Sequence, residues 1–263
     1  MGLLHLAAAL DTDGGHCADA TALAERGGLD FVTLAGADPQ AVVARAAALT
    51  TRIGLVTGTG TGAGTGAAYG RAGVRVGEPG PHGVPADAAV LVVDVTADPA
   101  TSRFAARYAD VALVRALGRA QAGELRAGLR RETAAAGRDP DALRVLAGLR
   151  VDLGGGEHAA EPGHGGGGPR HTAEGPLYRG GPVDLAELIA RWHADGAADG
   201  FHITPVEPRR DLERFVNGTV ALLQHRGLFR TFYPGGTLRE HLGLPRPVPA
   251  DRAGHDTMER LIT

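Results

Sequence analysis

Lysine is absent from this chain of 263 residues, so all 27 of its basic residues are arginines. Neither a Schiff-base lysine nor the lysine of a phosphate-binding P-loop is therefore available within the sequence. Serine occurs once, at Ser102, and there is no Gly-x-Ser-x-Gly turn, which excludes serine-based acyl transfer. The single cysteine, Cys17, excludes a disulfide framework and a cysteine-ligated zinc cluster.

Aromatic residues and surplus charge are also scarce. Only 4% of the residues are aromatic, so the core must be built from Leu, Val and Ala, and the net charge is -3. This near balance of charge argues against a nucleic-acid partner and against binding to a membrane surface. No apolar run is long enough to predict a membrane-spanning helix. The first residues carry no basic stretch typical of a signal peptide, so we expect a cytoplasmic protein.

What the chain does contain is a regular alternation of short apolar runs with helical patterns. Strands that are apolar on both faces and alternate with helices are typical of a parallel sheet in an α/β fold. The pattern predicts strands at 3–10, 29–34, 52–57, 73–76, 88–95, 110–114, 143–151 and 200–204. It predicts helices at 18–26, 39–50, 99–108, 119–136, 183–195 and 209–226. Eight strands indicate a TIM-like (β/α)8 barrel, shortened so that helices are missing after strands three and four.

Two Gly-rich segments, 57–70 and 154–171, interrupt this alternation and predict flexible loops. The first contains Gly62-x-Gly64-x-x-Ala67, which formally matches a dinucleotide-binding fingerprint. Too few residues follow it to open a helix, so the loop interpretation is preferred to an NAD(P) site. The second contains His158, His164 and His171, but their spacings match no zinc signature, and we expect no metal site.

Histidines and strand arginines are the candidate functional residues. His16 follows the first strand and His202 lies near the end of the eighth, where barrel enzymes place their chemistry. The first and eighth strands are neighbours in a closed barrel, so both side chains are candidate catalytic residues at one mouth. His5 could point into or out of the barrel. Arg75 and Arg150 lie in predicted buried strands, where an arginine needs a carboxylate or anion partner, unless it reaches solvent at a strand end.

Three blocks of the sequence carry a resemblance to a known family. They run from His5 to Leu34, from Phe104 to Pro140 and from Asp199 to Leu244; the last, with RGLFRT at 226–231 and TLREHLGL at 237–244, is the most specific. Together they resemble the bacterial luciferase-like flavin-dependent monooxygenases. The most similar branch contains the nitrilotriacetate, dibenzothiophene-sulfone and pristinamycin-type monooxygenases.

The resemblance implies a cofactor and its position. It implies reduced FMN supplied by a separate flavin reductase, reaction with O2, and a flavin at the C-terminal mouth of the barrel. Carried over by position, Thr57 and Thr59 are candidate flavin contacts, and Asp98 and Thr101 fall where the family holds the flavin phosphate. Asp98 is expected to cap its own helix and to repel the phosphate, which predicts weak or absent FMN binding.

The expected function is oxygenation of a small organic metabolite with reduced flavin and O2. The alternative is a non-catalytic barrel relative that has lost flavin binding and serves as a ligand- or partner-binding protein. We expect residues 1–226 to form a single barrel domain, with residues 227–263 as a tail packing on the barrel or on a neighbour. Missing outer helices would leave apolar strand surface to be covered, which predicts a homo-oligomer.

Overall fold

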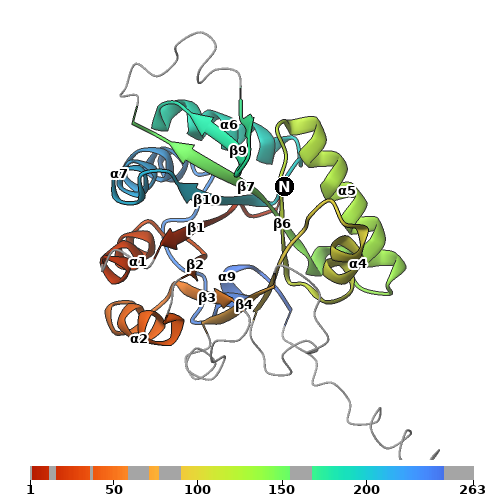
Figure 1. Ribbon diagram of the computed structural model, residues 1–263, viewed down its shortest axis with the longest axis horizontal. Coiled ribbons are helices and arrows are strands. Elements are labelled where there is room, and N and C mark those ends of the chain that lie inside the picture. The colour runs from red at the N-terminus through yellow and green to blue at the C-terminus, as the bar shows by residue number, and fades with distance from the viewer. Residues whose placement is uncertain are drawn as a thin grey trace, which may run out of the picture.

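Eight parallel strands close into a barrel in the computed structural model of the chain (Figure 1). The structure describes residues 2–11, 16–35, 38–58, 71–76, 90–154 and 168–245. The barrel strands are β1 (His5–Asp11), β2 (Phe31–Ala35), β3 (Gly54–Gly58), β4 (Ala72–Val76), β5 (Val90–Asp94), β6 (Val111–Val114), β7 (Arg144–Asp152) and β10 (Gly200–Pro205). The barrel is closed because β10 pairs in parallel with both β1 and β7. The predicted TIM-like fold is confirmed.

Helices surround this barrel (Figure 1). They are α1 (Cys17–Arg26), α2 (Pro39–Leu49), α4 (Pro99–Tyr108), α5 (Arg119–Ala135), α6 (Pro182–Ala194) and α7 (Pro208–Arg214), with a 3-10 turn at Pro140–Ala142. The helix predicted at 209–226 is observed as α7, a π-helical stretch (Phe215–Val220) and α8 (Ala221–His225). The prediction that helices are missing after the third and fourth strands falls on 59–70 and 77–89, which lie outside the described residues.

Local sequence signals fix where several helices begin and end. Asp38 and Asp98 cap α2 and α4, each accepting a backbone N–H of the first turn, and a proline follows each of them. Gly137 and Gly227 follow α5 and α8 with φ of 78° and 68°, a left-handed conformation that favours glycine. These boundaries match the predicted ones to within a residue or two.

Alternation along each strand separates the barrel interior from the layer under the helices. One set of residues packs together inside the barrel: Ala7, Phe31, Val56, Val92, Leu113 and Leu146. The residues that alternate with them along the strands face the helices and belong to a second cluster that also contains helix residues. Examples of these strand residues are Leu6, Val32, Leu55 and Ile203. On β10 the outward Phe201 packs against Trp192 of α6, with ring centroids 5.6 Å apart and the rings tilted by 47°. Residues on either side of Phe201 therefore face the interior.

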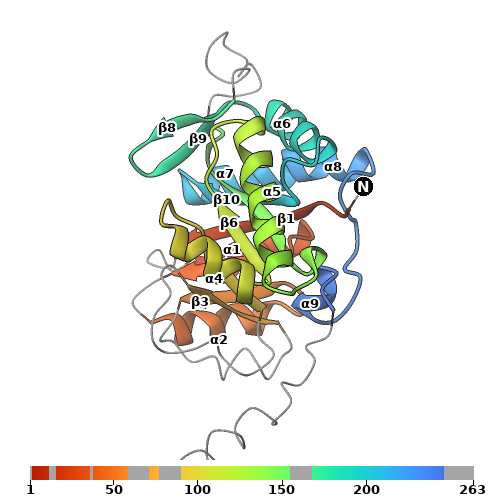
Figure 2. The ribbon, with the colours of Figure 1, turned by 90° about the vertical axis from the view of Figure 1, so that its right-hand side faces the viewer.

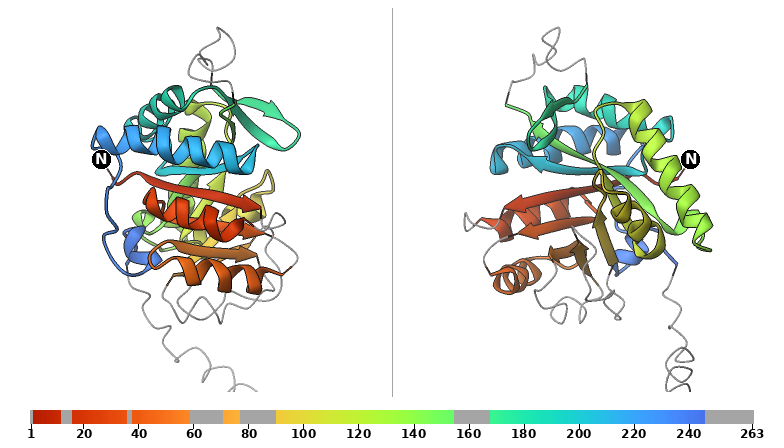
Figure 3. Two further views of the ribbon diagram at one scale, coloured as in Figure 1. Left: turned by 90° about the vertical axis from the view of Figure 1, so that its left-hand side faces the viewer. Right: turned by 45° about the vertical axis from the view of Figure 1, so that its right-hand side comes forward.

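The N-terminal end of the barrel is sealed by the segment that follows α8. This segment contains α9 (Leu238–His241), and Leu238, Leu242 and Leu244 join the interior cluster. In the left view of Figure 3, α9 lies at the end of the barrel where the strands begin. Of the predicted tail 227–263, the part described, up to Pro245, thus packs on the barrel of its own chain.

Buried carboxylates tie this segment to the strands. Asp30, at the start of β2, accepts the Leu6 N–H at 2.8 Å and the Arg230 guanidinium at 2.9 Å, and lies 3.1 Å from His5 Nδ1. Burial acts to raise the pKa of Asp30. The charges of Arg230 and His5 outweigh burial, so the pKa of Asp30 lies below its ordinary value. His5 therefore belongs to a structural network at the closed end, far along its strand from the mouth.

A hairpin that the sequence pattern did not predict extends the sheet at the other end. It consists of β8 (Arg170–Thr172) and β9 (Gly175–Arg179). β9 pairs in parallel with the last residues of β7, beyond the point where β6 stops pairing with it. The hairpin projects at the end of the barrel where the strand arrows point (Figure 2; Figure 3, left). It therefore forms part of the wall of the open mouth.

Candidate functional site

The interior of the barrel changes from apolar to polar toward its C-terminal mouth. Arg75, Asp94, Arg150, His202 and Thr204 all line a cavity of about 470 Å³ there. They come from β4, β5, β7 and β10, the strand positions that alternation turns inward. A second hollow of about 510 Å³ lies outside the barrel between the start of α5 and α6, and its charged lining residues, Arg119, Asp184, Glu187 and Arg191, are helix surface residues instead of strand residues that face the barrel interior. The barrel mouth is therefore the candidate site.

Two ion pairs neutralise the strand arginines. Arg75 donates from Nε and Nη2 to the two carboxylate oxygens of Asp94, at 2.7 and 2.8 Å, an arrangement in which both hydrogen bonds are charge-assisted. Arg150 pairs with Glu174, which lies in the turn between β8 and β9. The expectation that these buried-strand arginines have carboxylate partners is therefore met for both.

His202 lies deeper in the same cavity as a neutral imidazole. Its Nε2 is 3.0 Å from the Thr33 hydroxyl, and its ring stacks on Phe31 at 6.1 Å between centroids. Burial, together with the charge of Arg75 and against that of Asp94, lowers the pKa of His202 to about 3. At neutral pH the ring is thus uncharged, and it contributes a hydrogen-bonding nitrogen instead of a cation to the cavity.

His16 and Thr57, two other residues predicted at this site, are not among the described residues that line the cavity. His16 occupies the N-cap position of α1, is exposed, and is not among the residues that line the cavity. Thr57 shares a strand face with Leu55, which packs in a cluster with the helix layer, so its side chain is turned away from the interior. Thr59 lies outside the described residues. The pairing of His16 with His202 remains a prediction.

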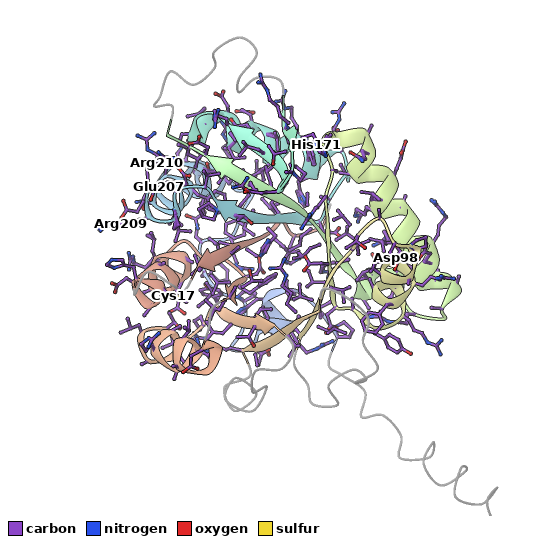
Figure 4. All side chains as sticks on the ribbon, viewed as in Figure 1. Cys17, Asp98, His171, Glu207, Arg209 and Arg210 are labelled. Atoms are coloured by element: carbon purple, nitrogen blue, oxygen red, sulfur yellow. The ribbon has the colours of Figure 1, made fainter. Side chains whose placement is uncertain are left out.

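The start of α4, where the family resemblance locates the flavin phosphate, already has its donors occupied. The Asp98 carboxylate accepts the Ala100 N–H at 2.8 Å, and the Asp98 carbonyl accepts the Thr101 N–H at 3.0 Å and its hydroxyl at 2.7 Å. Thr101 is buried and its hydroxyl also accepts the Thr96 N–H at 3.1 Å. Figure 4 shows Asp98 at the end of this helix. A tightly held phosphate does not fit here, because the donors are occupied and a carboxylate is already present.

Of the polar residues in the cavity wall, the sequence indicated only Arg75, Arg150 and His202; among those it did not indicate are Arg115, Gln121 and Glu174. They lie just after β6, in α5 and in the unpredicted hairpin. Arg115 is two residues beyond the inward-facing Leu113, so strand alternation could have pointed to it. Glu174 carried no such signal, since its position depends on how the hairpin folds back over β7.

Two further features of the described residues bear on the site. No group of three or more His, Cys, Asp or Glu side chains in the described ranges is arranged to hold a metal ion. Within the same ranges, no helix has both the length and the apolar character needed to cross a membrane.

Comparison with solved structures shows which proteins share this barrel fold. The EDTA monooxygenase from Chelativorans sp. BNC1 matches with a TM-score of 0.75 at 16% identity, covering 93% of this chain and 99% of that chain. A long-chain alkane monooxygenase matches with a TM-score of 0.71 at 14% identity, covering 96% and 97%. At these identities the likeness shows the fold alone.

Sequence similarity to curated proteins is stronger but covers a shorter stretch. Nitrilotriacetate monooxygenase component A from Aminobacter aminovorans is 48% identical over 68 residues, which is 26% of this chain and 15% of that protein. N-acetyl-S-(2-succino)cysteine monooxygenase from Bacillus subtilis (strain 168) is 44% identical over 72 residues, 27% of this chain and 16% of that protein. No family model matches the chain. The resemblance to luciferase-like flavin-dependent monooxygenases is confirmed, although the matched stretch is a small part of each relative.

Proposed function

We propose that this protein oxygenates a small organic metabolite at the barrel mouth, using O2 and reduced FMN that a separate flavin reductase supplies. The observation that supports the proposal most is the cavity of about 470 Å³ at the C-terminal mouth of a barrel shared with monooxygenases. Because the start of α4 does not fit a phosphate, the flavin is a weakly bound reactant and not a resident group. We place the reaction in the cytoplasm.

The chain's own residues would bind and orient the metabolite. Leu113, Leu149 and Leu125 supply apolar wall, while Thr204 and the His202 ring supply neutral polar groups. A neutral imidazole held by Thr33 can accept or donate a hydrogen bond without attracting a charged competitor. The site thus combines apolar contact with a few fixed polar groups, which is typical of small-molecule pockets.

A coupled assay tests the proposal. The protein, a flavin reductase, NADH and FMN would be mixed with a panel of organic compounds under labelled O2. We expect at least one compound to acquire an oxygen label, and His202→Asn to lower its formation while leaving the far-UV spectrum unchanged. If no compound in a broad panel is labelled while the reductase steadily delivers reduced FMN, the proposed activity is wrong.

A second candidate function is a ligand-binding barrel that performs no turnover. The observation that favours it is the capped start of α4, where the Asp98 carboxylate accepts the Ala100 N–H and the Asp98 carbonyl accepts the Thr101 hydroxyl. The two functions differ in one measurable respect. A non-catalytic barrel binds its ligand equally well with and without reduced FMN and never changes the rate at which O2 reoxidises the flavin.

A further inference from the structure

Among the described residues that line the mouth cavity, the charges do not cancel. These ionisable residues are Arg75, Asp94, Arg115, Arg150 and Glu174, with His202 neutral. Asp94 balances Arg75 through two hydrogen bonds, and Glu174 pairs with Arg150. Arg115 makes no ion pair with any residue of the described ranges. Within this described set, the positive charge of Arg115 is therefore unbalanced.

The Arg150–Glu174 ion pair is weaker than the Arg75–Asp94 ion pair. Glu174 is 68% exposed, whereas Asp94 is 24% exposed. A carboxylate so open to water gains little from its partner, because solvent and salt screen the attraction. An anion entering the cavity could therefore take the place of Glu174 beside Arg150 at small cost.

Arg115 and Arg150 are brought to the same part of the rim by the β8–β9 turn. Glu174 in this turn contacts Arg150, and a side-chain carbon placed on the next residue, Gly175, would lie 3.8 Å from Arg115 Cδ. Gln121 lines the cavity beside them, and its amide oxygen accepts the Leu117 N–H at 2.9 Å. The amide NH2 of Gln121 is thereby left as a donor.

We infer that the mouth cavity binds organic anions, with the acidic group held by Arg115 and Arg150 and the organic body against the apolar wall of Leu113, Leu125 and Leu149. Two guanidinium groups and an amide NH2 match the acceptor oxygens of a carboxylate, sulfonate or phosphate. Glu174 acts as the internal anion that the ligand displaces. That the bound anion is the metabolite to be oxygenated rests on the proposed function, whereas the binding site itself does not.

Binding of a matched pair of probes, phenylacetate and its neutral amide phenylacetamide, tests this inference without any flavin. Isothermal titration calorimetry of the full chain should show that phenylacetate binds and that its affinity falls as the salt concentration rises. Phenylacetamide should bind at least about tenfold more weakly, because it lacks a charge-assisted contact worth ~1.4 kcal/mol. Equal binding of acid and amide would overturn the inference.

Variants locate the site. Arg115→Gln should weaken phenylacetate binding about tenfold, and Glu174→Gln should strengthen it by removing the competing carboxylate. Arg209→Gln is the control: Arg209 is 79% exposed, pairs with Glu213 and lies on the outer side of α7 in Figure 4, so binding should not change. A loss in Arg209→Gln equal to that in Arg115→Gln would show a general charge effect and contradict the inference.

The phosphate group of FMN is another anion that could bind at the rim. Comparing the binding of FMN with that of riboflavin, which lacks the phosphate, distinguishes it from an organic acid. If FMN binds more tightly than riboflavin and Arg115→Gln abolishes that difference, the rim holds the flavin phosphate and the assignment to the metabolite is wrong. If FMN and riboflavin bind alike while phenylacetate binding needs Arg115, the assignment to an organic acid stands. Because neither arm uses turnover, a failed oxygenation assay leaves this result readable.

Discussion

At the scale of single residues, several strand residues that face the barrel interior near the mouth are charged. They differ in whether they form an ion pair and in how far they are exposed to solvent. Arg75 and Asp94 neutralise each other inside the wall, whereas Arg115 stands at the rim without an ion pair among the residues described. His202, below them, is kept neutral by burial. The described residues of the mouth thus combine an uncharged His202 with an unbalanced Arg115, and the proposed binding of an organic acid depends on this combination.

The buried His202 predicts a specific dependence of stability on pH. In the native state its pKa is about 3, whereas an unfolded histidine takes up a proton below about pH 6.5. Between these values the unfolded state binds more protons, so lowering the pH destabilises the fold. Relative to His202→Asn, the free energy of unfolding of the native sequence should fall by up to about 1.4 kcal/mol per pH unit between pH 6.5 and 4. Urea unfolding at several pH values measures this.

His225→Gln is the matched control for that experiment. His225 lies exposed at the end of α8, so its replacement should leave the pH dependence parallel to that of the native sequence. Parallel curves for the native sequence and His202→Asn would contradict the assignment of a buried neutral imidazole.

At the scale of secondary structure, hydrophobic alternation and capping residues were sufficient to predict the eight barrel strands and the helices around them. The hairpin β8–β9 was not predicted because its first strand, Arg170-His171-Thr172, is short and polar and is stabilised by pairing with β9. The helix α9 was missed because four residues carry too little periodicity, and its leucines become core only when the segment folds back under the barrel. Both elements depend on contacts distant in sequence.

Contacts between residues distant in sequence also limited how much of the candidate site could be predicted. Arg150 was recognised as unusual within its strand, but its partner Glu174 lies in the unpredicted hairpin. Asp98 was predicted as a cap from the Asp-Pro pair alone, and the structure shows that bond. Local chemistry was therefore predictable, whereas the set of side chains that share the cavity required the fold.

The segment containing α9 should contribute strongly to stability. Leu238 is fully buried against the barrel interior, so Leu238→Ala should lower the free energy of unfolding by about 2–5 kcal/mol. Phe232, in the same segment, is 74% exposed, and Phe232→Ala should change it by less than about 0.5 kcal/mol. Chemical denaturation compares the two, and similar small losses would show that the segment is not a structural seal.

At the scale of the whole molecule, the two ends of the barrel are built for different tasks. The N-terminal end is closed by leucines of the α9 segment and fixed by the network of Asp30, Arg230 and His5. The C-terminal end is open and holds the cavity, with the hairpin as part of its wall. Stability and ligand binding are thus separated along the barrel axis, as is general for this fold.

The protein is also predicted to associate with itself. The connections after β3 and β4 are short for a barrel of this kind, which predicts apolar strand surface that a second copy would cover. Light scattering at micromolar concentration should therefore give a mass of at least two chains. A monomeric mass under the same conditions would refute this prediction.

Anaerobic titration of reduced FMN into the native protein and into Asp98→Ser measures whether the charge at the start of α4 weakens flavin binding. We expect a colourless protein as purified, weak binding of FMN to the native sequence, and binding about tenfold tighter to Asp98→Ser. The reason is that serine still caps the helix but removes a charge that opposes the phosphate by at least ~1.4 kcal/mol. A submicromolar dissociation constant for the native protein, or no gain in affinity in Asp98→Ser, would show that Asp98 does not oppose the flavin phosphate.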